Sequence, residues 1–196
     1  MNIRLATVED SVQIAEIHKK EINQGFLSEL GDAFLAEFYR AIIQSPGGFC
    51  VVAEDEERVI GFISGCERIG GFYKFFFKTH TVKALRILLP KVFNVGRVKK
   101  IFETLFYPRK EKNMPSAELL TIAVESAYQG KGIARPLFGA FVEEMKRRGV
   151  VEFKVLVGES LPRAIAFYEK LGFVFHSKTE IHSQKPSRVY IHKIND

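Results

Sequence analysis

The stretch that decides the fold is ELLTIAVESAYQGKGIARPLF, residues 118–138. The apolar run from Leu119 to Val124 predicts a buried strand. Gly130 and Gly132 then mark a tight turn, and a helix is predicted from 132 to 148. A turn of this kind directs several backbone N–H groups at one point before a helix N-terminus, where phosphate oxygens bind. The sequence therefore predicts a site for a small molecule that carries phosphate groups.

The rest of the chain alternates between strand and helix patterns. Strands are predicted over 2–6, 49–53, 59–65, 117–124, 151–157, 173–181 and 188–194, and helices over about 12–18, 31–45, 132–148 and 160–170. The β-α-β order across 117–157 indicates an α/β sheet protein. With 196 residues, 46% of them hydrophobic, we expect a single domain over 1–196.

The composition also bears on location and cofactors. The first residues lack the apolar core of a signal peptide, and no apolar run is long enough to cross a bilayer. Cys50 and Cys66 lie inside apolar, strand-like runs, where a cysteine acts as a small hydrophobic residue. The five histidines are scattered without the spacing of metal ligands, so no metal is expected. These features predict a cytoplasmic protein.

One segment differs from its surroundings in charge. Residues 72–112 hold 11 Lys or Arg and 2 Glu, a net charge of +9, whereas the whole chain carries +6. Apolar residues at helical spacing over 82–92, with Pro90 as a kink, and again over 98–105 predict two amphipathic helices. We interpret 72–115 as a basic helical insertion between strands.

Two motifs make the chain resemble the GNAT superfamily of acetyl-CoA-dependent N-acetyltransferases. Gln129, Gly132 and Ala134 fill that family's signature of Gln or Arg, two residues, Gly, one residue, then Gly or Ala. The helix that ends in AIAFYEKLGF, residues 164–173, matches its second marker at the expected distance. The resemblance covers nearly all of the chain outside the insertion. It implies a mixed, mostly antiparallel central sheet flanked by helices.

The resemblance also implies how acetyl-CoA, as cosubstrate, would be held. Backbone groups of the strand would bind the pantetheine arm, backbone N–H groups of the turn would bind the pyrophosphate, and two basic side chains would lie near the adenosine phosphates. The residues concerned are Ile122, Ala123 and Val124 for the first role, Gln129, Gly130, Lys131, Gly132, Ile133 and Ala134 for the second, and Lys131 and Arg135 for the third.

The catalytic assignments come from the same resemblance. Tyr168 matches the tyrosine that protonates the leaving thiolate in many relatives, and Glu118 matches a glutamate that serves as base in some of them. Other relatives carry a glutamate on the next strand, where this chain has Leu156, and Glu159 is a spare candidate. An asparagine that often contacts pantetheine in relatives is replaced here by Leu161.

Each assignment has a plainer alternative. The glycine turn could be a tight connection without a ligand, Tyr168 a core aromatic residue beside Phe167, and Glu118 an exposed residue at a strand end. The function expected is acetyl transfer to a primary amine, of a small molecule first and of a protein second. The alternative function is a non-catalytic CoA-binding module whose basic helices dock an anionic partner.

The role of the basic insertion stays open between three interpretations. It could form a lid over the acceptor, a surface for an anionic partner such as a membrane through residues 72–112, or a subunit interface in a homodimer. Nucleic acid is disfavoured as a partner. The identity of the acceptor does not follow from the sequence.

Overall fold

The computed structural model describes residues 1–22, 26–88, 114–181 and 185–194. Its centre is a seven-stranded sheet in the order β1-β2-β3-β4-β5-β7-β6. Neighbouring strands are antiparallel except β4 and β5, which are parallel. This confirms the predicted mixed, mostly antiparallel sheet. The strands are β1 (Asn2–Leu5), β2 (Gly48–Asp55), β3 (Arg58–Cys66), β4 (Glu118–Val124), β5 (Glu152–Gly158), β6 (Val174–Ile181) and β7 (Lys185–Lys193).

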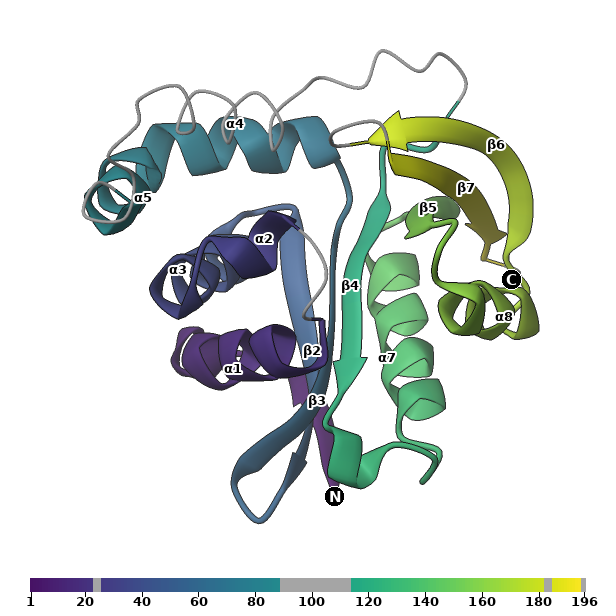
Figure 1. Ribbon diagram of the computed structural model, residues 1–196, viewed down its shortest axis with the longest axis horizontal. Coiled ribbons are helices and arrows are strands. Elements are labelled where there is room, and N and C mark those ends of the chain that lie inside the picture. Colours follow the sequence, from purple (N-terminus) through teal and green to yellow (C-terminus); the bar gives the residue numbers. More distant parts are fainter. Residues whose placement is uncertain (23–25, 89–113, 182–184, 195–196) are drawn as a thin grey trace.

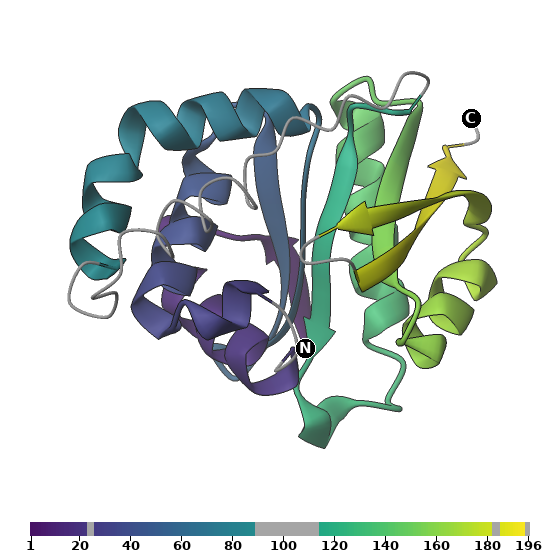
Figure 2. The same ribbon diagram turned by 45° about the horizontal axis from the view of Figure 1, so that its top comes forward.

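Helices cover both faces of this sheet. The helices are α1 (Ser11–Glu21), α2 (Phe26–Glu29), α3 (Asp32–Gln44), α4 (Ile69–Thr79), α5 (Thr81–Leu88), α7 (Ala134–Arg147) and α8 (Pro162–Lys170). In Figure 1, α1, α2 and α3 lie on one side of the central strands and α7 on the other. Figures 1 and 2 both show α4 and α5 along the end of the sheet where β4 begins. The short helix α2 had no signal in the sequence pattern.

Aromatic side chains fill the two cores that the sheet separates. On the α1 and α3 side, the ring of Phe38 packs edge-on against Phe72 of α4, with centroids 5.5 Å apart. On the α7 side, Phe141 packs edge-on against Phe153 of β5 at 5.4 Å, and Phe138 lies 5.7 Å from Phe173. Burial of large apolar side chains on both faces is the main favourable term in folding. The helices predicted over 31–45 and 132–148 are present as α3 and α7, and their buried apolar residues face these cores.

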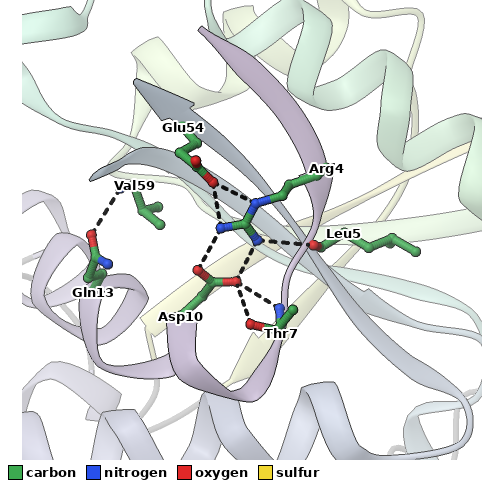
Figure 3. A network of polar contacts seen from close by, with 7 residues as sticks. All are labelled: Arg4, Leu5, Thr7, Asp10, Gln13, Glu54 and Val59. Atoms are coloured by element: carbon green, nitrogen blue, oxygen red, sulfur yellow. Dashed lines mark hydrogen bonds and ion pairs between the residues drawn. The ribbon is translucent and has the colours of Figure 1, made fainter. Parts of the chain in front are cut away.

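A polar network fixes the N-terminal strand to the rest of the sheet (Figure 3). The Arg4 guanidinium contacts the Asp10 carboxylate at 2.7 and 2.9 Å and the Glu54 carboxylate at 2.6 Å. Asp10 also accepts the Thr7 N–H at 2.7 Å. Burial alone would raise the pKa of Asp10, but these hydrogen bonds outweigh it and leave the pKa below its ordinary value. The network joins β1, β2 and the start of α1, and its role is structural.

The described part of the insertion begins earlier than the sequence predicted. The aromatic run around Phe75 belongs to α4, which starts at Ile69. Helix α5 covers 81–88, and the rest of the stripe predicted to continue to 92 lies outside the described residues. The sequence did not predict α4 because aromatic residues occur on several sides of that helix. In the structure, Phe72 and Phe76 point into the core. The helix predicted over 98–105 lies outside the described residues.

Candidate functional site

The central strand β4 has two unlike halves. Toward β5, the strand pairs at Glu118 with Lys154 and at Leu119 with Val155, and within the described chain the β4–β5 ladder holds no further pair. Toward β3, the pairing continues to Val124. Residues 118–119 are therefore bonded on both sides, and we call them the closed half of β4. Residues 120–124 have no pair toward β5, and of these Thr121 to Val124 are paired with β3; we call 120–124 the open half.

The change between the halves coincides with a bulge. In the register with β3, Thr121 pairs with Ser64 and Leu119 with Gly65, so that Leu120 is an extra residue on β4. A bulge of this kind bends a strand and increases its twist, and bulges often lie beside functional sites. Leu120, Thr121 and Ile122 are only half-buried although they belong to a central strand. Of the three predicted pantetheine residues, Ile122 keeps partial exposure and Ala123 and Val124 are buried.

The predicted phosphate turn follows the open half after one short 3-10 turn, Ser126–Tyr128. Gly130 and Gly132 have φ values of +77° and +81°, a left-handed backbone conformation that glycine adopts without strain. No atom lies within 4 Å of the position that a Cβ would take at either residue. The turn is exposed, and α7 starts two residues later at Ala134. The space above the glycines is therefore free to receive a ligand close to the backbone.

The backbone N–H groups of this turn divide into two sets. Those of Gln129 and Lys131 donate within the turn, to the carbonyls of Ser126 at 3.3 Å and Tyr128 at 3.4 Å. The other set has no acceptor among the described residues, and it consists of the N–H groups of Gly130, Gly132, Ile133, Ala134 and Arg135. Unsatisfied N–H groups at a helix N-terminus, where the dipole adds positive charge, form a ready anion site.

Basic side chains flank the turn, as the sequence suggested. Lys131 and Arg135 are both exposed, and the Lys131 ammonium lies 4.8 Å from the centroid of the Tyr128 ring. Gln129 is exposed too, but its side-chain amide donates to the Val124 carbonyl at 2.9 Å and to Glu21 at 3.2 Å. The Gln129 side chain thus ties the turn to the end of β4.

Glu118 is buried, so the alternative of an exposed residue at a strand end is wrong. Its carboxylate lies 3.8 Å from the ammonium of Lys154, which is buried too and donates to the Pro115 carbonyl. The reason is tertiary: β4 and β5 still pair at this point, and the neighbouring strand covers the side chain. Glu118 lies in the closed half, two residues before the bulge at Leu120.

Tyr168 lies in the core between α8 and the sheet. Its ring packs edge-on against Phe173 at 5.2 Å and Phe167 at 5.4 Å. Burial raises the pKa of the phenol well above its ordinary value, so that it stays protonated across the physiological range. The ring is thus part of the core, as the plainer alternative held, and its hydroxyl is held in the form that can donate a proton.

The other candidates have different positions. Glu159 forms ion pairs with Lys178 of β6 at 2.9 Å and with Arg188 of β7 at 3.2 Å. These ion pairs lower the pKa of Glu159 and hold its carboxylate beside β6 and β7. Leu156 of β5 is half-buried. Leu161 is the residue before α8 and is 43% exposed. Because leucine has no side-chain donor or acceptor, it cannot make the hydrogen bond that an asparagine would make there.

Several buried or bridging polar groups had no signal in the sequence pattern. His18 Nδ1 lies 2.5 Å from the Tyr39 hydroxyl, and His80 Nδ1 lies 2.8 Å from Glu37. Glu21, at the end of α1, reaches the segment before the glycine turn, 105 residues away in the chain. Partners this distant cannot be paired from one sequence. Cys50 and Cys66 are buried and free, as expected.

Two further properties concern metal binding and membrane spans in the described residues. No three His, Cys, Asp or Glu side chains in that part of the chain are grouped as metal ligands would be. None of the helices described there has the length and apolar character needed to cross a membrane.

Comparison with known proteins points to one family. The sequence profile of the Acetyltransferase (GNAT) family matches residues 13–173. The ribosomal protein bS18-alanine N-acetyltransferase of Escherichia coli (strain K12) is 40% identical over 60 residues, which are 31% of this chain and 40% of that protein. The chain thus aligns with less than half the length of that curated relative.

Solved structures agree in fold. SsHAT superposes with a TM-score of 0.76 at 15% identity, covering 100% of this chain and 98% of its own. An aminoglycoside 6'-N-acetyltransferase crystallised with coenzyme A gives 0.64 at 15% identity, with the same two coverages of 100% and 98%. Identities this low show the fold alone. Because the family profile covers most of the sequence, the chain belongs to the GNAT family of acetyltransferases.

Proposed function

We propose that this protein binds acetyl-CoA along the open half of β4 and transfers the acetyl group to a primary amine. The observation that carries the proposal is that two features follow each other in the chain. The edge of β4 over 120–124 is unpaired toward β5, and one 3-10 turn later comes a turn with five N–H groups that have no acceptor among the described residues. An extended pantetheine arm fits the first feature like an added strand, and a pyrophosphate fits the second.

The fit can be followed residue by residue. Backbone groups of Ile122, Ala123 and Val124 would hold the arm on the side of β4 that β5 leaves free. The N–H groups of Gly130, Gly132, Ile133 and Ala134 would hold the pyrophosphate, and Lys131 and Arg135 would add positive charge from the exposed side of the turn. The N–H groups of Gln129 and Lys131 contribute less, because both already donate within the turn.

Acetyl-CoA supplies an activated acetyl group as a thioester. The amine nitrogen bonds to the acetyl carbon, the bond from that carbon to sulfur breaks, and the amine gives up a proton while the thiolate gains one. Backbone N–H groups of β4 would polarise the acetyl carbonyl. Tyr168, held protonated by burial, would supply the proton to the thiolate.

Removal of the amine proton is assigned to Glu118 acting through water. Its carboxylate is buried in the closed half, beside Lys154, whereas the arm would lie along the open half. Direct contact with the amine does not fit this position, and a short water chain does. Glu159 is a poorer base because its carboxylate is paired with Lys178 and Arg188.

The acceptor is proposed as a small-molecule amine first and a protein amine second. The second choice gains weight from the relative named for acetylating an alanine of a ribosomal protein, over 60 aligned residues. All seven strands contribute to one sheet, which supports a single domain over 1–196. Cytoplasmic location, a homodimer and contact of 72–112 with a membrane surface stay predictions.

The test is calorimetric titration with acetyl-CoA of the parent, of Gly132→Glu and of Gly139→Glu. Gly132 has a φ of +81° and faces the proposed phosphate site, whereas Gly139 is exposed further along α7 with open space around it. We expect Gly132→Glu to weaken binding at least about tenfold, since it adds strain and a repelling charge, and Gly139→Glu to bind like the parent.

A parent that does not bind acetyl-CoA contradicts the proposal. If it binds, thiol release is measured with an aminoglycoside and with a peptide that begins with alanine. Binding without turnover of any amine would favour the non-catalytic CoA-binding module instead.

A further inference from the structure

The segment between β4 and the glycine turn is held by a side chain from the opposite part of the fold. Glu21 is the last residue of α1. Its carboxylate accepts the Ser126 N–H at 2.9 Å, the Ser126 hydroxyl at 2.6 Å and the Gln129 side-chain amide at 3.2 Å. Three donors therefore converge on one carboxylate.

These donors belong to a defined local structure. Ser126 begins the one-turn 3-10 helix Ser126–Tyr128. The Glu21 carboxylate accepts a hydrogen bond from the N–H at the start of that turn, as a capping side chain would. Gln129 follows that turn, and its amide also donates to the Val124 carbonyl at 2.9 Å. Glu21 thus fixes both ends of the 3-10 turn, and Gln129 carries the restraint to the last residue of the open half.

The position of Glu21 carries an electrostatic cost. A carboxylate close to a phosphate-binding turn repels the phosphates that the turn would hold. Since the Glu21 contacts are exposed, water screens much of that repulsion. The two effects of Glu21 on ligand affinity therefore oppose each other: positioning of the turn raises affinity, and charge lowers it.

We propose that Glu21 is a positioning residue for the coenzyme, and that it holds the glycine turn in the conformation that binds phosphate. This inference rests on the proposed function. It assigns to α1, a helix on the far face of the sheet from α7, a part in coenzyme binding through contact with the segment before the turn. Hydrogen bonds to a charged group are stronger than those between neutral groups, so three of them on one carboxylate can hold the turn in place.

The experiment compares Glu21→Ala, Glu21→Gln and a matched control, Glu16→Ala. Glu16 is exposed on the same helix, and its side chain makes no hydrogen bond or ion pair with the described residues. The alanine at 21 removes both the contacts and the charge. The glutamine removes the charge but keeps an oxygen for the Ser126 N–H, so it separates positioning from repulsion.

The first readout is binding of coenzyme A and of pantetheine, which lacks the phosphates. We expect Glu21→Ala to raise the Kd for coenzyme A about tenfold, Glu21→Gln to raise it less, and Glu16→Ala to leave it unchanged. Pantetheine should bind all four proteins equally. In turnover, KM for acetyl-CoA should rise about tenfold in Glu21→Ala, with kcat within about twofold of the parent.

The second readout needs no ligand. In amide hydrogen exchange of the free protein, the Ser126 N–H should exchange at least about tenfold faster in Glu21→Ala than in the parent or in Glu16→Ala. This result depends on the contact alone and does not depend on what the turn binds.

The outcomes separate the two proposals. Unchanged affinity for coenzyme A in Glu21→Ala, or tighter binding in both Glu21 variants, would overturn the positioning role, the latter because repulsion alone would then act. A parent that binds no coenzyme A overturns the proposed function and the coenzyme role of Glu21 together, even where the exchange result confirms the contact.

Discussion

The two halves of β4 belong to one continuous strand and have opposite surroundings. The closed half is bonded to β3 and β5, and its Glu118 is buried beside Lys154. The open half is bonded to β3, and its first three residues are half-buried although they lie at the centre of the sheet. The boundary is the bulge at Leu120.

The comparison shows that the neighbours of a strand decide its role. In the closed half, packing leaves no free volume: a Cβ at Gly65, opposite Leu119, would lie 2.6 Å from the Phe141 ring and 2.7 Å from the Glu118 carbonyl. Past the open half, Gly130 and Gly132 have open space around them. Substitutions should therefore affect stability at one end and ligand affinity at the other.

The largest effect is expected in the closed half. Gly65→Val forces a branched side chain against the Phe141 ring and the β4 backbone, which cannot both move away. We expect a loss of about 3 kcal/mol in the free energy of unfolding, measured by urea denaturation. The control Gly139→Ala, in an open position on α7, should be neutral or slightly stabilising. Equal stability of the two variants would contradict the close packing of the closed half.

The next effect concerns the catalytic role proposed for Tyr168, beside the ligand that the open half would bind. Tyr168→Phe removes the hydroxyl while keeping the ring that packs on Phe173. If the phenol protonates the thiolate, kcat should fall about 10²-fold, with the Kd for acetyl-CoA unchanged. The control Tyr190→Phe removes a buried hydroxyl that bonds Glu169, and kcat should be kept. A fall of less than about twofold in Tyr168→Phe would leave that residue a purely structural role.

A third effect tests the polar pair beneath the open half. Tyr39, which holds His18, packs on Phe62, the partner of Ala123. Burial lowers the pKa of His18 from 6.5 to about 4, so the unfolded chain binds a proton there before the folded protein does. Stability should therefore fall with decreasing pH below 6.5, by about 2 kcal/mol between pH 7 and pH 5.

The measurement is denaturation of the parent and of His18→Asn at both pH values. Asparagine cannot be protonated, and its amide can still reach the Tyr39 hydroxyl. The variant should be less stable at pH 7 and should lose about 2 kcal/mol less on acidification. An identical pH slope in both proteins would show that His18 titrates normally.

The smallest effect on stability is expected at the turn. Gly132→Ala places a Cβ at a φ of +81°, which costs about 1 kcal/mol, but meets no neighbouring atom. Its loss of stability should be well below that of Gly65→Val, whereas its affinity for acetyl-CoA should fall because the turn is distorted. A stability loss as large as that of Gly65→Val would mean that the turn is packed and not open.

Much of the fold was readable from local patterns. The strand and helix that contain residues 118–138 are present as β4 and α7, and the predicted closing hairpin is present as β6 and β7. Such patterns suffice because hydrophobic periodicity and glycine positions act within a few residues. The same locality explains the misses. Helix α4 has its aromatic residues buried by α3, and Glu118 is covered because β5 lies beside it.

By itself, the sequence determined the strands, the helices α1, α3, α7 and α8, the glycine turn after β4 and the family motifs around Gln129 and Tyr168. Only the tertiary structure decided where β5 leaves β4, that Glu118 is buried, and that Glu21 reaches Ser126. The physical reason is distance along the chain. Backbone conformation follows from neighbouring residues, whereas an unpaired strand edge or a carboxylate shared by three donors depends on segments about a hundred residues apart that meet only on folding.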